Sequence, residues 1–307
     1  MVTRRLRVAV VGPGGIGGLL AAVLARGGAE VTCVAREHTA TRLAAQGITV
    51  RSTTLGNFTV PIAAVTSLSR APDVCLVTVK SPALEAAMAT VAPAALGDAA
   101  VIPLLNGVEH LDTLRSAYGA DRVIAGTIRV EAARLGSGFI EHSTPFADIQ
   151  LAPTAPHPAL PRLADALTAA GVGVAIREDP VAMLWDKLAF LAPFALATAR
   201  RDAPIGRVRD RHRGGLLALV ADTIPVARAH GAIATEESVV AFLDALPDTM
   251  TSSLHRDLDA GLPSELDAIG GAVLRAAARL GLALPTAEEY IESITARDAV
   301  AAREARR

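Results

Sequence analysis

The first half of the chain alternates between short apolar runs and segments with helical spacing. Apolar, β-branched runs at Arg7–Val11 and Glu30–Ala35 predict two buried strands, and Leu19–Leu24 predicts a helix between them. The same pattern predicts helices at 39–46, 83–95 and 160–170 and strands at 48–52, 58–63, 73–79, 99–104 and 172–177. Strands that alternate with helices form a parallel sheet with crossover helices on both faces, so we expect an α/β fold with a doubly wound sheet.

The pattern changes near residue 178. From 122 to 151 the segments are β-like, with a predicted hairpin at Gly136–Gly138. Asp179 and Pro180 then suit the N-cap and first position of a helix, and helical spacing continues towards the end of the chain. A chain of 307 residues is long enough for two cores. We therefore predict a sheet-containing domain at 1–178 and an all-helical C-terminal domain at 179–307.

Three glycines follow the first predicted strand and open the next helix, with the spacing G-x-G-x-x-G. In this context the first glycine makes a tight turn, the second lets the backbone approach a pyrophosphate, and the third packs the helix on the strand. The alternative is a glycine-rich turn that only packs a helix. We predict a Rossmann-type dinucleotide site whose cofactor contacts are Gly12, Gly14, Gly15, Ile16 and Gly17.

The end of the second predicted strand indicates which dinucleotide binds. An NAD site usually has Asp or Glu there for the ribose hydroxyls, whereas an NADP site has a cation for the 2′-phosphate. This chain has Arg36, directly followed by Glu37. The ordinary alternative is a solvated charge at a strand end. Arg36 predicts NADP(H).

Composition and charge exclude several classes. The formal net charge of −1 argues against nucleic acid or an anionic membrane as the main partner. Cys33 and Cys75 lie in apolar runs without zinc-ligand spacing, and the seven histidines show no metal spacing, so no metal is predicted. No apolar run approaches the roughly 18 residues that span a membrane. Arg4-Arg5 imitates an export signal, but glycines interrupt the apolar run that follows, so we expect a cytoplasmic protein.

Five polar residues are candidates for chemistry. Lys80 and Asn106 each follow a predicted strand, where open α/β sheets bind ligands. Lys187 lies beside apolar positions of the first C-terminal helix, and a partly desolvated lysine has a lowered pKa and can deliver a proton. Ser253 and Glu265 come near the starts of later helices. Each alone has an ordinary alternative, such as a solvated charge, an Asn-Gly turn or a favourable charge at a helix start.

Together these residues resemble the ketopantoate reductase family, NADPH-dependent enzymes that reduce a branched 2-oxo acid. The resemblance runs along nearly the whole chain and implies a Rossmann domain, a helical domain and a cleft between them. It implies that Lys187 is the general acid and that Glu265 contacts this lysine and the substrate hydroxyl. Ser253 looks like a ligand of the substrate carboxylate. Lys80 and Asn106 resemble residues on the nicotinamide side, where Asn106 also meets the substrate.

The resemblance breaks at two positions of the lysine helix. The family typically has asparagines four and eight residues after the lysine, where they hold the substrate, but this chain has Leu191 and Ala195. The two positions share a helix face, so this substrate wall is expected to be apolar. Substrate hydroxyls would lie unpaired against it. We expect a 2-oxo acid or related carbonyl less polar than ketopantoate.

Other functions fit part of the pattern. β-Hydroxyacid dehydrogenases and imine reductases share the Rossmann-plus-helical plan, but hydroxyacid dehydrogenases use a Lys-x-x-x-Asn motif that this chain lacks. A non-catalytic NADP-binding protein would have no need for Lys187, Glu265 and Ser253 together. The apolar helical half leaves a homodimer open, because apolar spacing does not separate core from contact surface.

Overall fold

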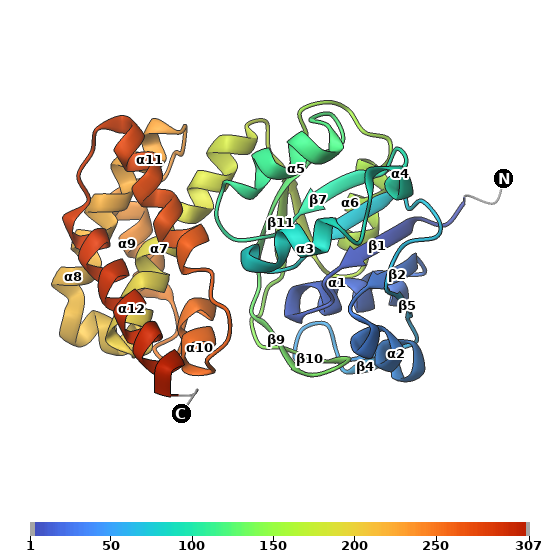
Figure 1. Ribbon diagram of the computed structural model, residues 1–307, viewed down its shortest axis with the longest axis horizontal. Helices are drawn as coiled ribbons and strands as arrows, with labels where there is room; N and C mark the ends of the chain where they lie inside the picture. The colour runs from blue at the N-terminus through green and yellow to red at the C-terminus, as the bar shows by residue number, and fades with distance from the viewer. Residues whose placement is uncertain (1–3, 305–307) are drawn as a thin grey trace. The chain divides into compact units, whose positions relative to one another are not determined.

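Five parallel strands form the central sheet of the first half of the chain, drawn mainly in blue to green in Figure 1. Their order is β5 (Ala63–Val65), β2 (Glu30–Val34), β1 (Arg7–Val11), β6 (Val74–Val77) and β7 (Ala100–Pro103). The structure is a computed structural model and describes residues 4–304. The strand order reverses between β1 and β6, and doubly wound sheets bind ligands beyond the carboxyl ends of the strands at such a point. The predicted α/β fold with a doubly wound sheet is confirmed.

Helices connect these strands, and two predicted elements were wrong in detail. The helix expected over 83–95 is broken, because Pro93 starts a new helix and Ala92 before it is extended (ψ 148°). The strand expected over 58–63 is two strands of different sheets, separated at Pro61. The helices are α1 (Gly15–Arg26), α2 (Glu37–Gln46), η1 (Ser81–Ala83), α3 (Leu84–Met88), α4 (Pro93–Leu96), α5 (His110–Tyr118) and α6 (Ala159–Ala169).

Two smaller sheets complete this half. One has the order β4 (Phe58–Val60), β3 (Ile48–Ser52), β10 (Phe139–His142) and β9 (Ala132–Gly136). The predicted hairpin at Gly136–Gly138 joins β9 and β10, which pair antiparallel. The other has the order β12 (Gly173–Ile176), β11 (Asp148–Ala152) and β8 (Ala125–Arg129).

The rest of the described chain is helical. Its elements are α7 (Pro180–Arg201), α8 (Ile205–Ala229), α9 (Glu236–Ala245), α10 (Ser253–Asp259), the π-helical turn η2 (Asp267–Gly271), α11 (Ala272–Leu280) and α12 (Pro285–Glu304). The chain divides into two compact units, and the four residues Asn106–Glu109 belong to the helical unit together with Val181 and the residues after it. The segment after β7 thus joins the core of helices that come much later in the sequence.

Helix α7 corrects one expectation from the sequence. Its most apolar 18-residue window has a mean hydropathy of 1.4, so by length and composition alone this helix could cross a membrane. However, 72% of that window is buried inside the protein. Trp185 and Leu188 belong to the core of the helical unit. The apolar composition of α7 is therefore accounted for by its place in this core.

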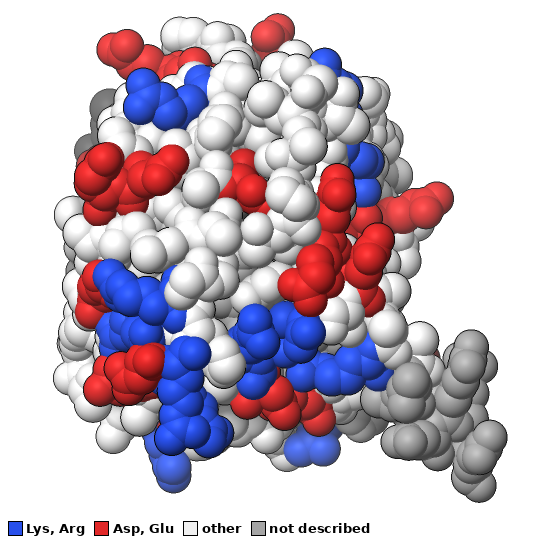
Figure 2. Space-filling model, turned by 90° about the vertical axis from the view of Figure 1, so that its left-hand side faces the viewer, with Lys and Arg blue, Asp and Glu red and all other residues white. Residues whose placement is uncertain are grey.

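The surface of the helical unit carries charges of both signs. On the face shown in Figure 2, acidic side chains predominate in the upper part and basic side chains in the lower part, around a broad uncharged area. Among the described residues on α8, Arg213 forms a bidentate pair with Asp244 on α9.

Candidate active site

The glycine turn lies at the carboxyl end of β1, beside the end of β6. Gly12 has a left-handed backbone (φ +82°), and a Cβ there would collide with the side chain of Val79. A Cβ on Gly17 would collide with Oγ1 of Thr78 and would lie 2.6 Å from the carbonyl oxygen of Gly12. A Cβ on Gly15 would collide with the carbonyl oxygen of Ala132. The packing of the protein itself therefore requires these three glycines.

Gly14 is different, because among residues 4–304 a Cβ there would meet only the carbonyl oxygen of Gly12, at 3.9 Å. Gly14 is the N-cap of α1, which has no side-chain cap and no acidic residue in its first turn. A helix N-terminus without a side-chain cap, beside a backbone without a Cβ, is what an approaching pyrophosphate needs. The residues present therefore fit a dinucleotide, and we expect the backbone N–H groups of Gly15 and Ile16 to meet its phosphates.

Thr78 supports this turn, a role that the sequence analysis missed. Its hydroxyl lies 3.0 Å from the carbonyl oxygen of Val11 and 2.9 Å from that of Gly12, so it ties the turn to the end of β6. The same hydroxyl fills the space that a Cβ on Gly17 would take. The signal in the sequence is slight: a threonine directly after a buried strand.

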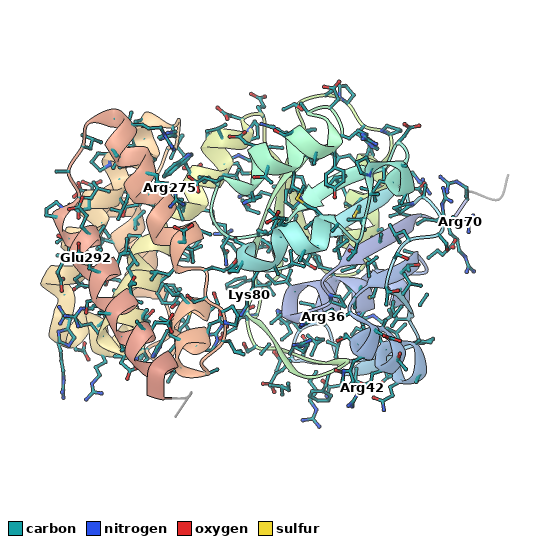
Figure 3. All side chains as sticks on the ribbon, in the orientation of Figure 1. Arg36, Arg42, Arg70, Lys80, Arg275 and Glu292 are labelled. Carbon is teal, nitrogen blue, oxygen red and sulfur yellow. The ribbon has the colours of Figure 1, made fainter. Side chains whose placement is uncertain are left out.

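Arg36 and Lys80 follow β2 and β6, whose carboxyl ends lie at the same edge of the sheet as the glycine turn (Figure 3). Arg36 is the N-cap residue of α2, and its side chain is exposed. In the part of the chain that the structure describes, its guanidinium makes no hydrogen bond or ion pair. Lys80 is exposed at the start of η1. In dinucleotide-binding folds, a cation near the end of the second strand binds the 2′-phosphate of NADP.

The helical unit brings three of the predicted site residues together. Nζ of Lys187 donates to Oδ1 of Asn106 at 3.0 Å, and Nδ2 of Asn106 donates to Oε2 of Glu265 at 2.8 Å. Glu265 is buried, with 6% of its surface exposed. Burial lowers the pKa of Lys187 from 10.5 to about 8, while the charge of Glu265 opposes part of this shift. The arrangement is a partly desolvated ammonium joined through one amide to a carboxylate.

The composition of the chain supports Lys187 as a candidate proton donor. Of its 30 basic side chains, 28 are arginines and only Lys80 and Lys187 are lysines. An arginine keeps its proton under all ordinary conditions, whereas a desolvated lysine can give its proton up. Both lysines of the chain therefore lie at positions that the sequence predicts as site residues.

Comparison with known proteins identifies the family. Residues 8–155 match the model of Ketopantoate reductase PanE/ApbA, and residues 179–298 match that of its C-terminal part. A 2-dehydropantoate 2-reductase of Halobacterium salinarum is 30% identical over 293 residues, which cover 91% of this chain and 95% of that relative. The chain belongs to the ketopantoate reductase family.

Two further comparisons agree. An uncharacterized oxidoreductase, YkpB of Bacillus subtilis, is 26% identical over 92% of this chain and 96% of its own length. A crystal structure of a PanE/ApbA family ketopantoate reductase from Ralstonia eutropha superimposes with a TM-score of 0.84 at 26% identity, and covers 96% of this chain and 99% of its own. Ketopantoate reductases are NADP-dependent oxidoreductases of CH–OH and C=O groups. The chain is therefore an oxidoreductase of this class with a nicotinamide cofactor, as predicted.

The residues predicted to contact a ketopantoate reductase substrate occupy different environments. Ser253 is the first residue of α10 and is partly exposed. Leu191, one turn after Lys187, is also partly exposed, whereas Ala195 is 0% exposed. Ala195 therefore belongs to the core of the helical unit, and Leu191 packs against that core with part of its surface exposed. Pro193 lies between them without ending α7.

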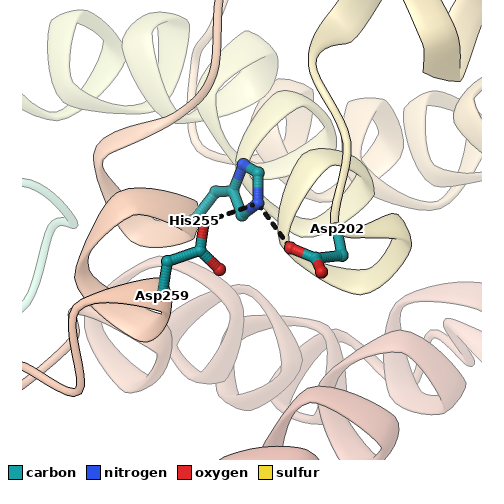
Figure 4. Close-up of side chains that lie close together, drawn as sticks. All are labelled: Asp202, His255 and Asp259. Atoms are coloured by element: carbon teal, nitrogen blue, oxygen red, sulfur yellow. Dashed lines mark hydrogen bonds and ion pairs between the residues drawn. The ribbon is translucent and has the colours of Figure 1, made fainter.

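His255 lies in a cluster that the sequence spacing did not indicate. Its Nε2 lies 2.8 Å from Oδ1 of Asp202 and 3.2 Å from Oδ2 of Asp259 (Figure 4). These three side chains converge as metal ligands could. However, Nδ1 of His255 is buried without a hydrogen-bond partner, and a metal-binding histidine needs a partner for the proton on that nitrogen. We assign a hydrogen-bonded cluster that ties α10 to the end of α7.

Proposed function

We propose that the protein reduces a 2-oxo acid with an apolar side chain to the 2-hydroxy acid, using NADPH. The observation that carries this proposal is the hydrogen-bonded chain from Lys187 through Asn106 to Glu265. It supplies a proton donor with a pKa of about 8, close to the pH at which an acid catalyst works well.

The residues of the helical unit would act on the carbonyl oxygen. When bound, NADPH would supply a hydride to carbon 2 of the substrate. Negative charge then develops on the carbonyl oxygen, where the Lys187 ammonium stabilises it more strongly than it stabilises the ketone and donates the proton. Asn106 holds the ammonium through Oδ1, and the Glu265 charge favours the protonated form of the lysine.

Arg36 supports NADPH over NADH. It follows β2, the strand whose end lies near the ribose 2′ position in dinucleotide-binding folds, and its exposed guanidinium makes no hydrogen bond or ion pair within the described residues. A guanidinium binds a phosphate with two parallel, charge-assisted hydrogen bonds, which a ribose hydroxyl cannot match. Glu37 next to it begins α2, where an acidic side chain also suits the helix N-terminus.

Leu191 supports a less polar substrate than ketopantoate. Relatives named 2-dehydropantoate 2-reductase act on that polar 2-oxo acid. A leucine one turn after the proton donor offers no hydrogen bond to a substrate hydroxyl, and a hydroxyl buried without a partner costs about 1–3 kcal/mol. A branched or linear alkyl 2-oxo acid has no such group to bury.

The experiment is an assay of nicotinamide oxidation by the purified protein. Ketopantoate and a series of branched, linear and aromatic 2-oxo acids are compared, each with NADPH and with NADH. We expect the highest kcat/KM for an alkyl 2-oxo acid with NADPH. High activity on ketopantoate alone would contradict the apolar substrate, and a preference for NADH would contradict the role of Arg36. No activity on any 2-oxo acid would refute the reaction proposed.

A further inference from the structure

The segment Asn106–Glu109 is docked at both of its ends. Asn106 bonds Glu265, and at the other end Glu109 forms a bidentate pair with Arg275 on α11, with N···O distances of 2.9 and 2.6 Å. Between them, Gly107 has φ +83°, and a Cβ there would collide with the carbonyl oxygen of Ala268. The Asn106-Gly107 pair therefore packs closely against the backbone at Ala268.

Arg275 also binds the turn that follows Glu265. Its Nη1 donates to Oδ1 of Asp267 at 2.7 Å, and Figure 3 labels Arg275 on α11. Asp267 begins the π-helical turn η2, and such turns are frequent at functional sites. Gly271 leaves room for this ion pair, because a Cβ there would collide with Asp267 and would lie 3.0 Å from Nη1 of Arg275.

We propose that Arg275 is a positioning residue: by binding Glu109 and Asp267 at once, it holds Asn106 and Glu265 in register with Lys187. The inference rests on the proposed function for the identity of Lys187 as the proton donor. Arg275 acts through its two carboxylate partners, one in the segment that carries Asn106 and one in the turn after Glu265.

The exposure of Arg275, Glu109 and Asp267 indicates that their ion pairs orient the site and contribute little to the stability of the fold. Arg275 is 41% exposed, Glu109 42% and Asp267 83%. Exposed ion pairs contribute little to the free energy of unfolding, because water screens them. A bidentate pair nevertheless fixes orientation, since two parallel hydrogen bonds leave the guanidinium one geometry. A misplacement of about 1 Å in a catalytic group can lower a rate by as much as ~100-fold.

The kinetic test is Arg275→Met, with Arg213→Met as the matched control. Arg213 forms a bidentate pair with Asp244 at similar exposure, 45% and 39%, between α8 and α9. We expect Arg275→Met to lower kcat by about 10- to 100-fold, with the melting temperature and the KM for NADPH unchanged. Arg213→Met should leave all three quantities unchanged.

A second readout does not depend on activity. The chain has only two lysines, so NMR of isotope-labelled lysine side chains gives two signals, and Lys80→Arg identifies that of Lys187. If Arg275 acted only as a distant positive charge, its removal would raise the pKa of Lys187. If its removal lets Glu265 move away, the pKa falls, because Glu265 is the charge that raises it. We expect the titration of Lys187 to move to lower pH in Arg275→Met.

The outcomes are distinct. The proposal is overturned if Arg275→Met has the kcat of Arg213→Met, or if its Lys187 titration stays in place or moves to higher pH. If Arg275→Met does not fold, Glu109→Gln replaces it with Asp244→Asn as control, and a loss of kcat confined to Glu109→Gln supports the proposal while equal kcat overturns it. A wild-type protein that reduces no 2-oxo acid refutes the proposed function, and the NMR titration then still decides whether Arg275 positions Glu265.

Discussion

Lys187 donates a hydrogen bond of 3.0 Å to Asn106, although 81 positions separate these residues in the chain. Asn106 in turn donates to Glu265, which lies 159 positions after it. An amide can join the two charged groups because it accepts at its oxygen and donates at its nitrogen. The Asn106 side chain therefore sets the distance between the Lys187 ammonium and the Glu265 carboxylate.

Replacing Lys187 should remove turnover and leave cofactor binding intact. We expect Lys187→Ala to lower kcat by about 10²–10⁴-fold, the usual contribution of a positioned acid. Lys187→Arg should fail similarly, because arginine keeps the charge and does not release the proton. The dissociation constant for NADPH, measured by fluorescence titration, should equal that of the wild type in both variants. An active Lys187→Arg enzyme would show that only the charge matters.

The activity should fall as the pH rises through about 8. A general acid must be protonated, and burial lowers the pKa of Lys187 from 10.5 to about 8. Glu265→Gln removes the charge that raises this pKa, so the alkaline limb of the kcat/KM profile should move to lower pH. Profiles of the wild type and this variant measure the shift. A limb that stays in place would mean that another group limits the rate.

Two glycines of the nucleotide turn should respond differently to alanine. A Cβ on Gly14 would make no contact closer than 3.9 Å with the described residues, so Gly14→Ala should keep its melting temperature while its affinity for NADPH falls, because the new methyl group occupies the approach of the pyrophosphate. Gly17→Ala should lose about 1–3 kcal/mol of unfolding free energy, because its Cβ collides with Thr78. Thermal unfolding and NADPH titration separate these effects. Unchanged NADPH affinity in Gly14→Ala would count against the phosphate at this turn.

Reversing the charge of Arg36 should change the choice of cofactor. In Arg36→Glu we expect the affinity for NADPH to fall by about tenfold or more, since a charge-assisted hydrogen bond contributes about 1.5–3 kcal/mol. The affinity for NADH should be unchanged or higher. Arg42→Glu, another exposed arginine of α2, is the matched control. If both variants weaken NADPH binding equally, the general field of the surface, and not Arg36, selects the cofactor.

A substitution at Leu191 should change the substrate preference, whereas one at Ala195 should change the stability. Leu191→Asn places an amide on a partly exposed position, and we expect it to raise kcat/KM for ketopantoate relative to an alkyl 2-oxo acid by about tenfold. Ala195→Asn should destabilise the protein by about 1–3 kcal/mol, because position 195 has no exposed surface. Substrate panels and thermal unfolding of both variants test this. Equal substrate ratios in Leu191→Asn and the wild type would place the specificity elsewhere.

The sequence by itself determined the features that depend on neighbours in the chain. The glycine turn, the strand before it and the helix after it are local, because they depend on backbone conformations that glycine permits and on apolar spacing over about ten residues. The doubly wound sheet followed from repetition of that unit, and the family followed from motifs in order along the chain. Local reasoning was wrong where a proline changed the element, as at Pro93 and Pro61.

Only the tertiary structure decided which of these residues meet. Lys187, Asn106 and Glu265 come from three segments, and long-range packing in the helical unit brings them within hydrogen-bond distance. It also set the roles of Thr78 and Arg275, whose partners are distant in sequence or lie across the π-helical turn. Burial separates Leu191 from Ala195 for the same reason, because helical periodicity gives both positions one face of α7, but only the surrounding helices determine which part of that face is covered.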